Sequence, residues 1–202
     1  NAARLTMSAR VPSTAVTLCM CSPADWYHKS GATLTRGVRA VPEAKVITLI
    51  INGQEESLHL PVHRTLLEAL RESGHVDVKH GCGKGDCGAC AVLIDGVAID
   101  SCLALAWMCE GAEITTVSGL GNAENPHPLQ TAFKELGAAQ CGFCTPGMII
   151  AAKGFLDENP DPSDAEIRLS LSGNLCRCTG YVKIVEAVGH AAKALREEGG
   201  EK

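Results

Sequence analysis

The chain has few aromatic side chains, with only three Phe, two Trp and two Tyr among 202 residues. It also has no apolar run near the ~20 residues that a membrane-spanning helix needs, so a soluble protein is expected. This length suits one medium domain or two small ones, and small domains with few aromatics need stabilisation beyond an aliphatic core. The cysteines are the first candidates for that role.

Basic side chains are scarce outside the first 42 residues. That segment carries five Lys and Arg residues against Asp25, whereas the rest of the chain has 13 basic and 22 acidic residues. An acidic body repels phosphate backbones, and there is no basic stripe interleaved with aromatics. Nucleic acid is therefore not expected as a partner.

Cysteine is abundant, with 11 residues. The odd count, together with the lack of a secretory hydrophobic segment or twin-arginine pair near the start, argues against a disulfide framework and against export. Metal ligation in a reducing compartment, the cytoplasm, is the expected use of these thiols.

Residues 1–44 show no sustained helical or strand period and are interpreted as an N-terminal extension of open role. A loosely ordered tail that drapes over a partner is the favoured interpretation, and its Arg and Ser content also resembles a transit peptide. Cys19 and Cys21 look like a ligand pair, but free thiols are expected there because enough other cysteines are available.

Residues 45–118 are predicted to form a small α+β domain. Two hairpins are expected, because Asn52-Gly53 and Asp95-Gly96 each separate two β-rich runs. A capping box, Thr65 with Glu68, predicts a short helix over residues 66–73. A further strand is expected over residues 114–117.

Residues 119–128 have the Gly, Asn and Pro content of a linker. Residues 129–202 are then predicted to be a helical domain. Thr145, Ser163 and Thr179 are the expected N-caps of three of its helices. Four helices are predicted, over residues 128–136, 146–157, 164–172 and 180–196.

The first cysteine motif has the spacing of a plant-type [2Fe-2S] site, with ligands Cys82, Cys87 and Cys90 among glycines that permit a tightly wrapped loop. The register of the second hairpin places Cys102 one step from Cys90 across the ladder, so Cys102 is the expected fourth ligand and Cys109 a buried structural thiol. Gly83, Gly85 and Gly88 also match a nucleotide-binding pattern. That pattern needs a helix after the loop, and a hairpin is expected there, so the match is interpreted as incidental.

The second motif consists of two cysteine pairs, Cys141 with Cys144 and Cys176 with Cys178. Each pair is followed by a threonine expected to cap a helix, so two helix N-termini would favour thiolates at one place. From the residues alone, four converging thiolates fit either structural zinc or an iron-sulfur cluster.

The strings over residues 81–90, 140–147 and 173–181 closely resemble the small iron-sulfur subunit of the molybdenum hydroxylases, the xanthine oxidase family. The resemblance covers about residues 45–197. It implies a β-grasp ferredoxin domain followed by a four-helix-bundle domain, each with one [2Fe-2S] cluster, and it favours iron over zinc at the second site. The implied ligands are Cys82, Cys87, Cys90 and Cys102 for the first cluster, and Cys141, Cys144, Cys176 and Cys178 for the second.

The resemblance also implies an arrangement of partners. The second cluster would lie nearest a molybdopterin cofactor on a large subunit, with Gln140 and Cys178 in contact with the pterin. The first cluster would lie towards FAD on a medium subunit, in a dimer of such heterotrimers in a bacterial cytoplasm.

The function expected from this arrangement is electron transfer, with no catalytic residue on this chain. Two rivals remain: a free-standing two-cluster ferredoxin, and a structural zinc protein. The substrate would be set by the large subunit.

Overall fold

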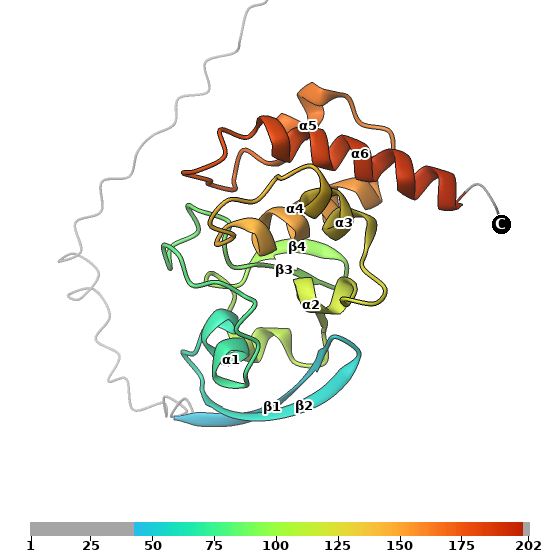
Figure 1. Cartoon of the computed structure of the whole chain (residues 1–202). Coiled ribbons are helices and arrows are strands. Elements are labelled where there is room, and N and C mark those ends of the chain that lie inside the picture. The colour runs from blue at the N-terminus through green and yellow to red at the C-terminus, as the bar shows by residue number, and fades with distance from the viewer. Residues whose placement is uncertain (1–42, 200–202) are drawn as a thin grey trace, which may run out of the picture. The chain divides into compact units, whose positions relative to one another are not determined.

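The structure, a computed structural model, describes residues 43–199 and contains one five-stranded sheet and six α-helices in that range (Figure 1). The predicted extension, with Cys19 and Cys21, lies outside the described residues apart from Glu43 and Ala44. The sheet has the order β2-β1-β5-β3-β4, in which β1 and β5 are parallel and the other pairs antiparallel. Its strands are β1 (Ala44–Ile51), β2 (Gln54–Pro61), β3 (Ala91–Ile94), β4 (Val97–Asp100) and β5 (Glu113–Thr115).

Both predicted hairpins are confirmed. The turn residues Asn52, Gly53, Asp95 and Gly96 all have positive φ, as a two-residue turn that matches the strand twist requires. The second hairpin pairs Ala91 with Asp100, so the chain on either side of the ladder, at residues 90 and 101, also meets. This register brings the end of the first cysteine motif next to Cys102.

Helix α1 (Leu66–Glu72) confirms the predicted helix and its capping box. The Thr65 side chain accepts a hydrogen bond from the Glu68 amide, and the Glu68 carboxylate accepts one from the Thr65 amide at 3.0 Å. The helix buries Leu66, Leu67 and Leu70 against the apolar side chains of β1. This cluster is the core of the first half of the described chain.

The strand predicted over residues 114–117 is displaced and shorter, because β5 ends at Thr115 and the chain turns at Thr116. The Asn52 side chain holds that turn: its Oδ1 accepts from the Thr116 amide at 2.9 Å and its Nδ2 donates to the Thr116 hydroxyl. A short helix, α2 (Val117–Leu120), follows, so the predicted linker begins with helical structure.

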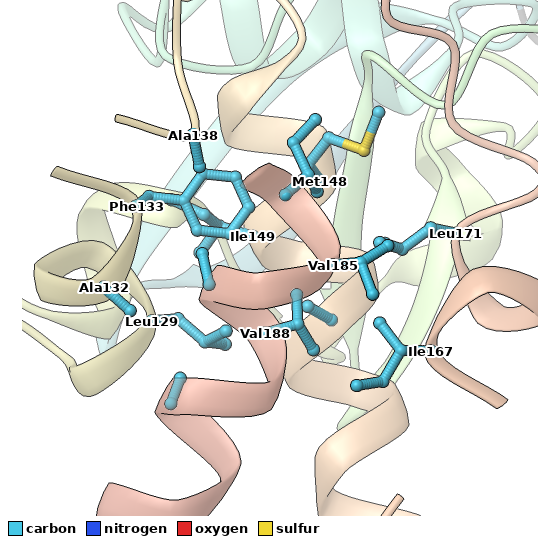
Figure 2. Close-up of a cluster of buried hydrophobic side chains, with 14 of the residues drawn as sticks. Leu129, Ala132, Phe133, Ala138, Met148, Ile149, Ile167, Leu171, Val185 and Val188 are labelled. Atoms are coloured by element: carbon cyan, nitrogen blue, oxygen red, sulfur yellow. The ribbon is translucent and has the colours of Figure 1, made fainter. Parts of the chain in front are cut away.

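Four further helices follow, as predicted. They are α3 (Pro128–Glu135), α4 (Thr145–Glu158), α5 (Asp164–Ser170) and α6 (Val182–Gly199). Ser163 caps α5 as expected, but the N-cap of α4 is Cys144 rather than Thr145, and α6 begins at Val182 rather than directly after Thr179. Figure 2 shows the apolar core among these helices, to which Leu129, Met148, Ile167 and Val188 contribute. No helix within residues 43–199 is long and apolar enough to cross a bilayer.

Strand β3 is buried on both faces, and this joins the two halves of the described chain. Val92 points into the core that α1 covers, whereas Ala91 and Leu93 pack against Ile150 of α4. Figure 1 shows α4 running alongside β3 and β4. A strand covered on both faces reads as a continuous apolar run, which is what residues 91–94 are.

We expect Gly147→Ala and Gly189→Ala to change stability in opposite directions. A Cβ at Gly147 would lie 2.1 Å from the Gly88 carbonyl oxygen, so α4 would be forced away from the cysteine loop. A Cβ at Gly189, in α6, would meet only the end of the Ile167 side chain at 3.7 Å, and Ala in a helix interior gains about 1 kcal/mol over Gly. Thermal unfolding of the two variants measures the difference, and equal melting temperatures would refute this account of the contact.

Candidate metal centres

The first cysteine loop wraps its own sulfur atoms in main-chain amides. The Cys82 sulfur accepts hydrogen bonds from the amides of Lys84, at 3.4 Å, and Asp86, at 3.2 Å. The Cys87 sulfur accepts one from the Cys82 amide at 3.4 Å. Gly83 and Gly85 have positive φ, which lets the loop turn tightly enough to aim these donors inward. Such an environment stabilises thiolates.

Cys90 and Cys102 form a second, buried pair in the same half of the chain. The Ser101 hydroxyl donates to the Cys90 carbonyl at 2.7 Å and the Ser101 amide to the same oxygen at 3.3 Å, so the segments that carry Cys90 and Cys102 lie side by side. Cys109 lies in a separate environment, where its sulfur donates to the Leu105 carbonyl at 3.6 Å. The geometry thus supports Cys102 over Cys109 as the partner of Cys90.

The second motif also assembles into two sulfur pairs. The Sγ atoms of Cys141 and Cys178 lie 3.7 Å apart, and both residues are exposed. Cys144, at the N-terminus of α4, has the Cys176 thiol as a neighbour, and both are partly buried. All four cysteines of the motif are therefore neighbours, although they come from two segments more than 30 residues apart.

The thiol pKa values reflect these surroundings. Hydrogen bonds from the amides of Lys84 and Asp86 lower the pKa of Cys82 to about 7, despite some desolvation. Burial raises the pKa of Cys90 to about 12. Burial, with the neighbouring Cys176 thiol, raises the pKa of Cys144 to about 12. Burial also acts on Cys176, but the Thr179 hydroxyl and amide outweigh it and lower its pKa to about 7. A bound metal deprotonates such thiols outright.

The spacing of Cys141 and Cys178 fits two thiolates on one metal. Two thiolates on one tetrahedral metal, with bonds of about 2.3 Å, have sulfurs about 3.8 Å apart, which matches the 3.7 Å between Cys141 and Cys178. A [2Fe-2S] cluster takes four thiolates, two on each iron, so two sulfur pairs per site are what it needs.

The segment after Cys176 explains why α6 begins late. Thr179 does not cap a helix, because its hydroxyl lies 3.0 Å from the Cys176 sulfur and accepts the Tyr181 amide at 3.3 Å. Gly180 and Tyr181 both have positive φ, so the backbone leaves the helical region until Val182. The expectation of two helix N-termini at the second motif is therefore wrong for Cys178 and holds only for Cys144.

The two cysteine sites touch through main-chain atoms. The Leu175 amide donates to the Cys87 carbonyl at 2.9 Å, and the Asn174 side chain donates to the Gly88 carbonyl at 3.1 Å. Leu175 directly precedes Cys176 of the second site, and Cys87 belongs to the first site, so the hydrogen bond joins the two sites. Asn174 and Tyr181 were not predicted as site residues. Their position on either side of the pair Cys176 and Cys178 is the sequence feature that could have indicated them.

Gln140 lies on the exposed surface, next to the exposed Cys141 and in the same region as Cys178. The outer sulfur pair of the second site and Gln140 thus share a surface that a partner can reach.

Two family models cover most of the described chain. Residues 49–116 match a 2Fe-2S iron-sulfur cluster binding domain, and residues 116–189 match a second [2Fe-2S] binding domain. The chain is therefore an iron-sulfur protein with two [2Fe-2S]-binding domains and an α+β fold.

Relatives specify the family further. The chain is 47% identical over 148 residues to the nicotinate dehydrogenase small FeS subunit of Eubacterium barkeri, covering 73% of this chain and 94% of the relative. It is 48% identical to the xanthine dehydrogenase iron-sulfur-binding subunit of Escherichia coli, covering 72% and 93%. A chain of quinoline 2-oxidoreductase from Pseudomonas putida 86 has a similar structure, with a TM-score of 0.73, 44% identity and coverage of 77% and 98%. The chain belongs to the family of small iron-sulfur subunits of the molybdenum hydroxylases.

We predict that Cys102→Ser and Cys109→Ser differ sharply in iron content. Loss of Cys102 leaves Cys90 without its sulfur partner, so the protein should lose the first cluster and about half of its iron. Cys109→Ser, a matched change at a thiol buried nearby, should keep both clusters. Iron analysis with the visible spectrum measures this, and loss of iron in the Cys109 variant instead would show that the fourth ligand is wrongly assigned.

Proposed function

We propose that this chain relays single electrons between a molybdopterin site on a large partner subunit and FAD on a medium one. The observation that carries the proposal is the main-chain contact between the two cysteine sites, Leu175 to Cys87, within one packed unit. When bound, each [2Fe-2S] cluster supplies one-electron redox chemistry, which lets a two-electron oxidation be passed on in single steps.

The proposed ligands are the eight cysteines of the two sites, grouped by their surroundings. For the first cluster, the amide-wrapped pair is Cys82 with Cys87 and the buried pair is Cys90 with Cys102. For the second, the exposed pair is Cys141 with Cys178, and Cys144 with Cys176 form the inner pair. The amide donors around Cys82 and the N-terminus of α4 behind Cys144 favour the negative charge of the bound sulfurs.

The contact between the sites gives the chain a short route for electrons. Cys87 and Leu175 are joined by a hydrogen bond between their main chains, and Leu175 is bonded directly to Cys176. The Asn174 side chain, 6% exposed, reinforces this contact through the Gly88 carbonyl. These residues hold the two ligand loops together.

The exposed pair, Cys141 with Cys178, is the part of the second site most open to a partner, and Gln140 lies beside it. This supports the proposal that Gln140 and Cys178 contact the pterin of the large subunit. The first site would then face the FAD subunit. The two relatives named above are called subunits of dehydrogenases, which supports an assembly with further subunits; a dimer of heterotrimers is its proposed form.

Residues 45–118 would form a β-grasp ferredoxin domain, residues 119–128 a linker and residues 129–202 a four-helix bundle, with residues 1–44 as an extension. The bacterial cytoplasm is the proposed compartment. The relatives are named for nicotinate, xanthine and quinoline, which supports placing substrate choice on the large subunit.

The order of the relay can be tested in the assembled enzyme with Cys102→Ser and Cys109→Ser. We expect substrate to reduce the second cluster in both variants, but to reduce flavin only in Cys109→Ser, because the other variant lacks the site next to FAD. Rapid-mixing spectra, with freeze-quenched samples for electron paramagnetic resonance (EPR), follow each centre separately.

Rapid flavin reduction in a Cys102→Ser enzyme shown to lack its first cluster would contradict the proposed order. A chain that purifies as a stable monomer, with both clusters and no partner, would instead favour a free-standing ferredoxin.

A further inference from the structure

The segment 174–181 carries two side-chain hydroxyls that form hydrogen bonds around Cys176. The Thr179 hydroxyl lies 3.0 Å from the Cys176 sulfur, and the Thr179 amide donates to the same sulfur at 3.5 Å. The Tyr181 hydroxyl accepts from the Cys176 amide at 2.7 Å and donates to the Asn174 carbonyl at 3.1 Å. Both ends of Cys176, sulfur and main chain, are therefore held by this segment.

The direction of the Thr179 hydrogen bond follows from the chemistry of the ligand. A metal-bound cysteine sulfur has lost its proton and can only accept, so the Thr179 hydroxyl must be the donor. The Tyr181 amide donates to the same hydroxyl oxygen at 3.3 Å, which occupies one lone pair and leaves the proton free to face the sulfur.

The backbone at Tyr181 adopts an unfavourable conformation that allows these hydrogen bonds. Its φ of 69° is in the left-handed region, where a bulky residue is an outlier. That conformation directs the Tyr181 amide back to Thr179 and its ring towards Cys176. It also delays the start of α6, so the fold gives up helical hydrogen bonds to keep these contacts.

We infer that Thr179 is a positioning residue which, through its hydroxyl donated to the Cys176 sulfur, raises the reduction potential of the second cluster, with Tyr181 holding the hydroxyl in place. The inference rests on the proposed function, because it assumes that Cys176 is a cluster ligand. Reduction adds negative charge to the sulfurs, so a donor aimed at one of them stabilises the reduced form more than the oxidised form.

The two sites differ in the kind of group that donates hydrogen bonds to the cysteine sulfur. The Cys82 sulfur takes its hydrogen bonds from the main-chain amides of Lys84 and Asp86, which side-chain substitution leaves in place. At Cys176 one donor is a side chain that can be removed. The first cluster therefore serves as an internal reference in the same molecule.

The test is an EPR-monitored redox titration of the intact protein, purified with its partners. Thr179→Val keeps the shape of the side chain and removes its hydroxyl. We expect the ratio of oxidised to reduced second cluster at a fixed potential to rise about tenfold, which is a fall of about 59 mV for a one-electron couple. The first cluster should keep its potential.

Four further variants complete the test. Thr179→Ser should retain the wild-type potential because it restores the donor. Tyr181→Phe keeps the amide that binds the Thr179 hydroxyl but removes the phenol contacts to the main chain of Cys176 and Asn174, so it should shift the second cluster in the same direction as Thr179→Val, but less. Ser170→Ala removes a hydroxyl that bonds only within α5, to the Ile167 carbonyl, and should change neither potential. If the valine side chain prevents assembly, Thr179→Ala removes the donor without bulk.

Unchanged potentials in Thr179→Val or Thr179→Ala, with both clusters present, would overturn the inference and leave the proposed function intact. An equal fall in both clusters would also overturn it, because a general loosening of the protein would then be the cause. A wild-type protein with no [2Fe-2S] signal would instead refute the proposed function.

Discussion

The close approach of the first cysteine loop to the helical half of the chain is the contact on which the rest of the structure depends. The Gly88 carbonyl accepts a hydrogen bond from Asn174 and lies where a side chain at Gly147 would have to go. Gly88 itself leaves no room, since a Cβ there would lie 2.3 Å from the Asn174 side-chain nitrogen. The absence of a side chain at Gly88 and Gly147, together with the Asn174 amide, thus allows the two ligand loops to meet at main-chain distance.

This contact has consequences for both stability and function. It adds to the apolar packing of β3 on α4, where Leu93 and Ile150 meet, so the two [2Fe-2S]-binding domains share one buried interface. Function needs the same closeness, because electrons move between centres that are held near one another and away from water. The few aromatic residues of the chain are consistent with domains organised around inorganic clusters as well as aliphatic cores.

The features predictable from sequence were those set by local chemistry. The two hairpins follow from Asn52-Gly53 and Asp95-Gly96, and the hairpin register was enough to choose Cys102 over Cys109 as the neighbour of Cys90. The start of α6 was predicted wrongly, because Thr179 looks like an N-cap but its hydroxyl is engaged by a cysteine sulfur. The contact of Asn174 with Gly88 joins residues 86 positions apart, and no local pattern reports such a contact.

EPR of the intact, fully reduced protein tests the central claim, that two [2Fe-2S] clusters lie close together on this chain, most directly. The account predicts two distinct signals of equal intensity, each equivalent to one spin per chain, with a magnetic interaction between them at low temperature because Leu175 and Cys87 join their ligand loops. A single signal, two signals without interaction, or a colourless protein that contains zinc would contradict it.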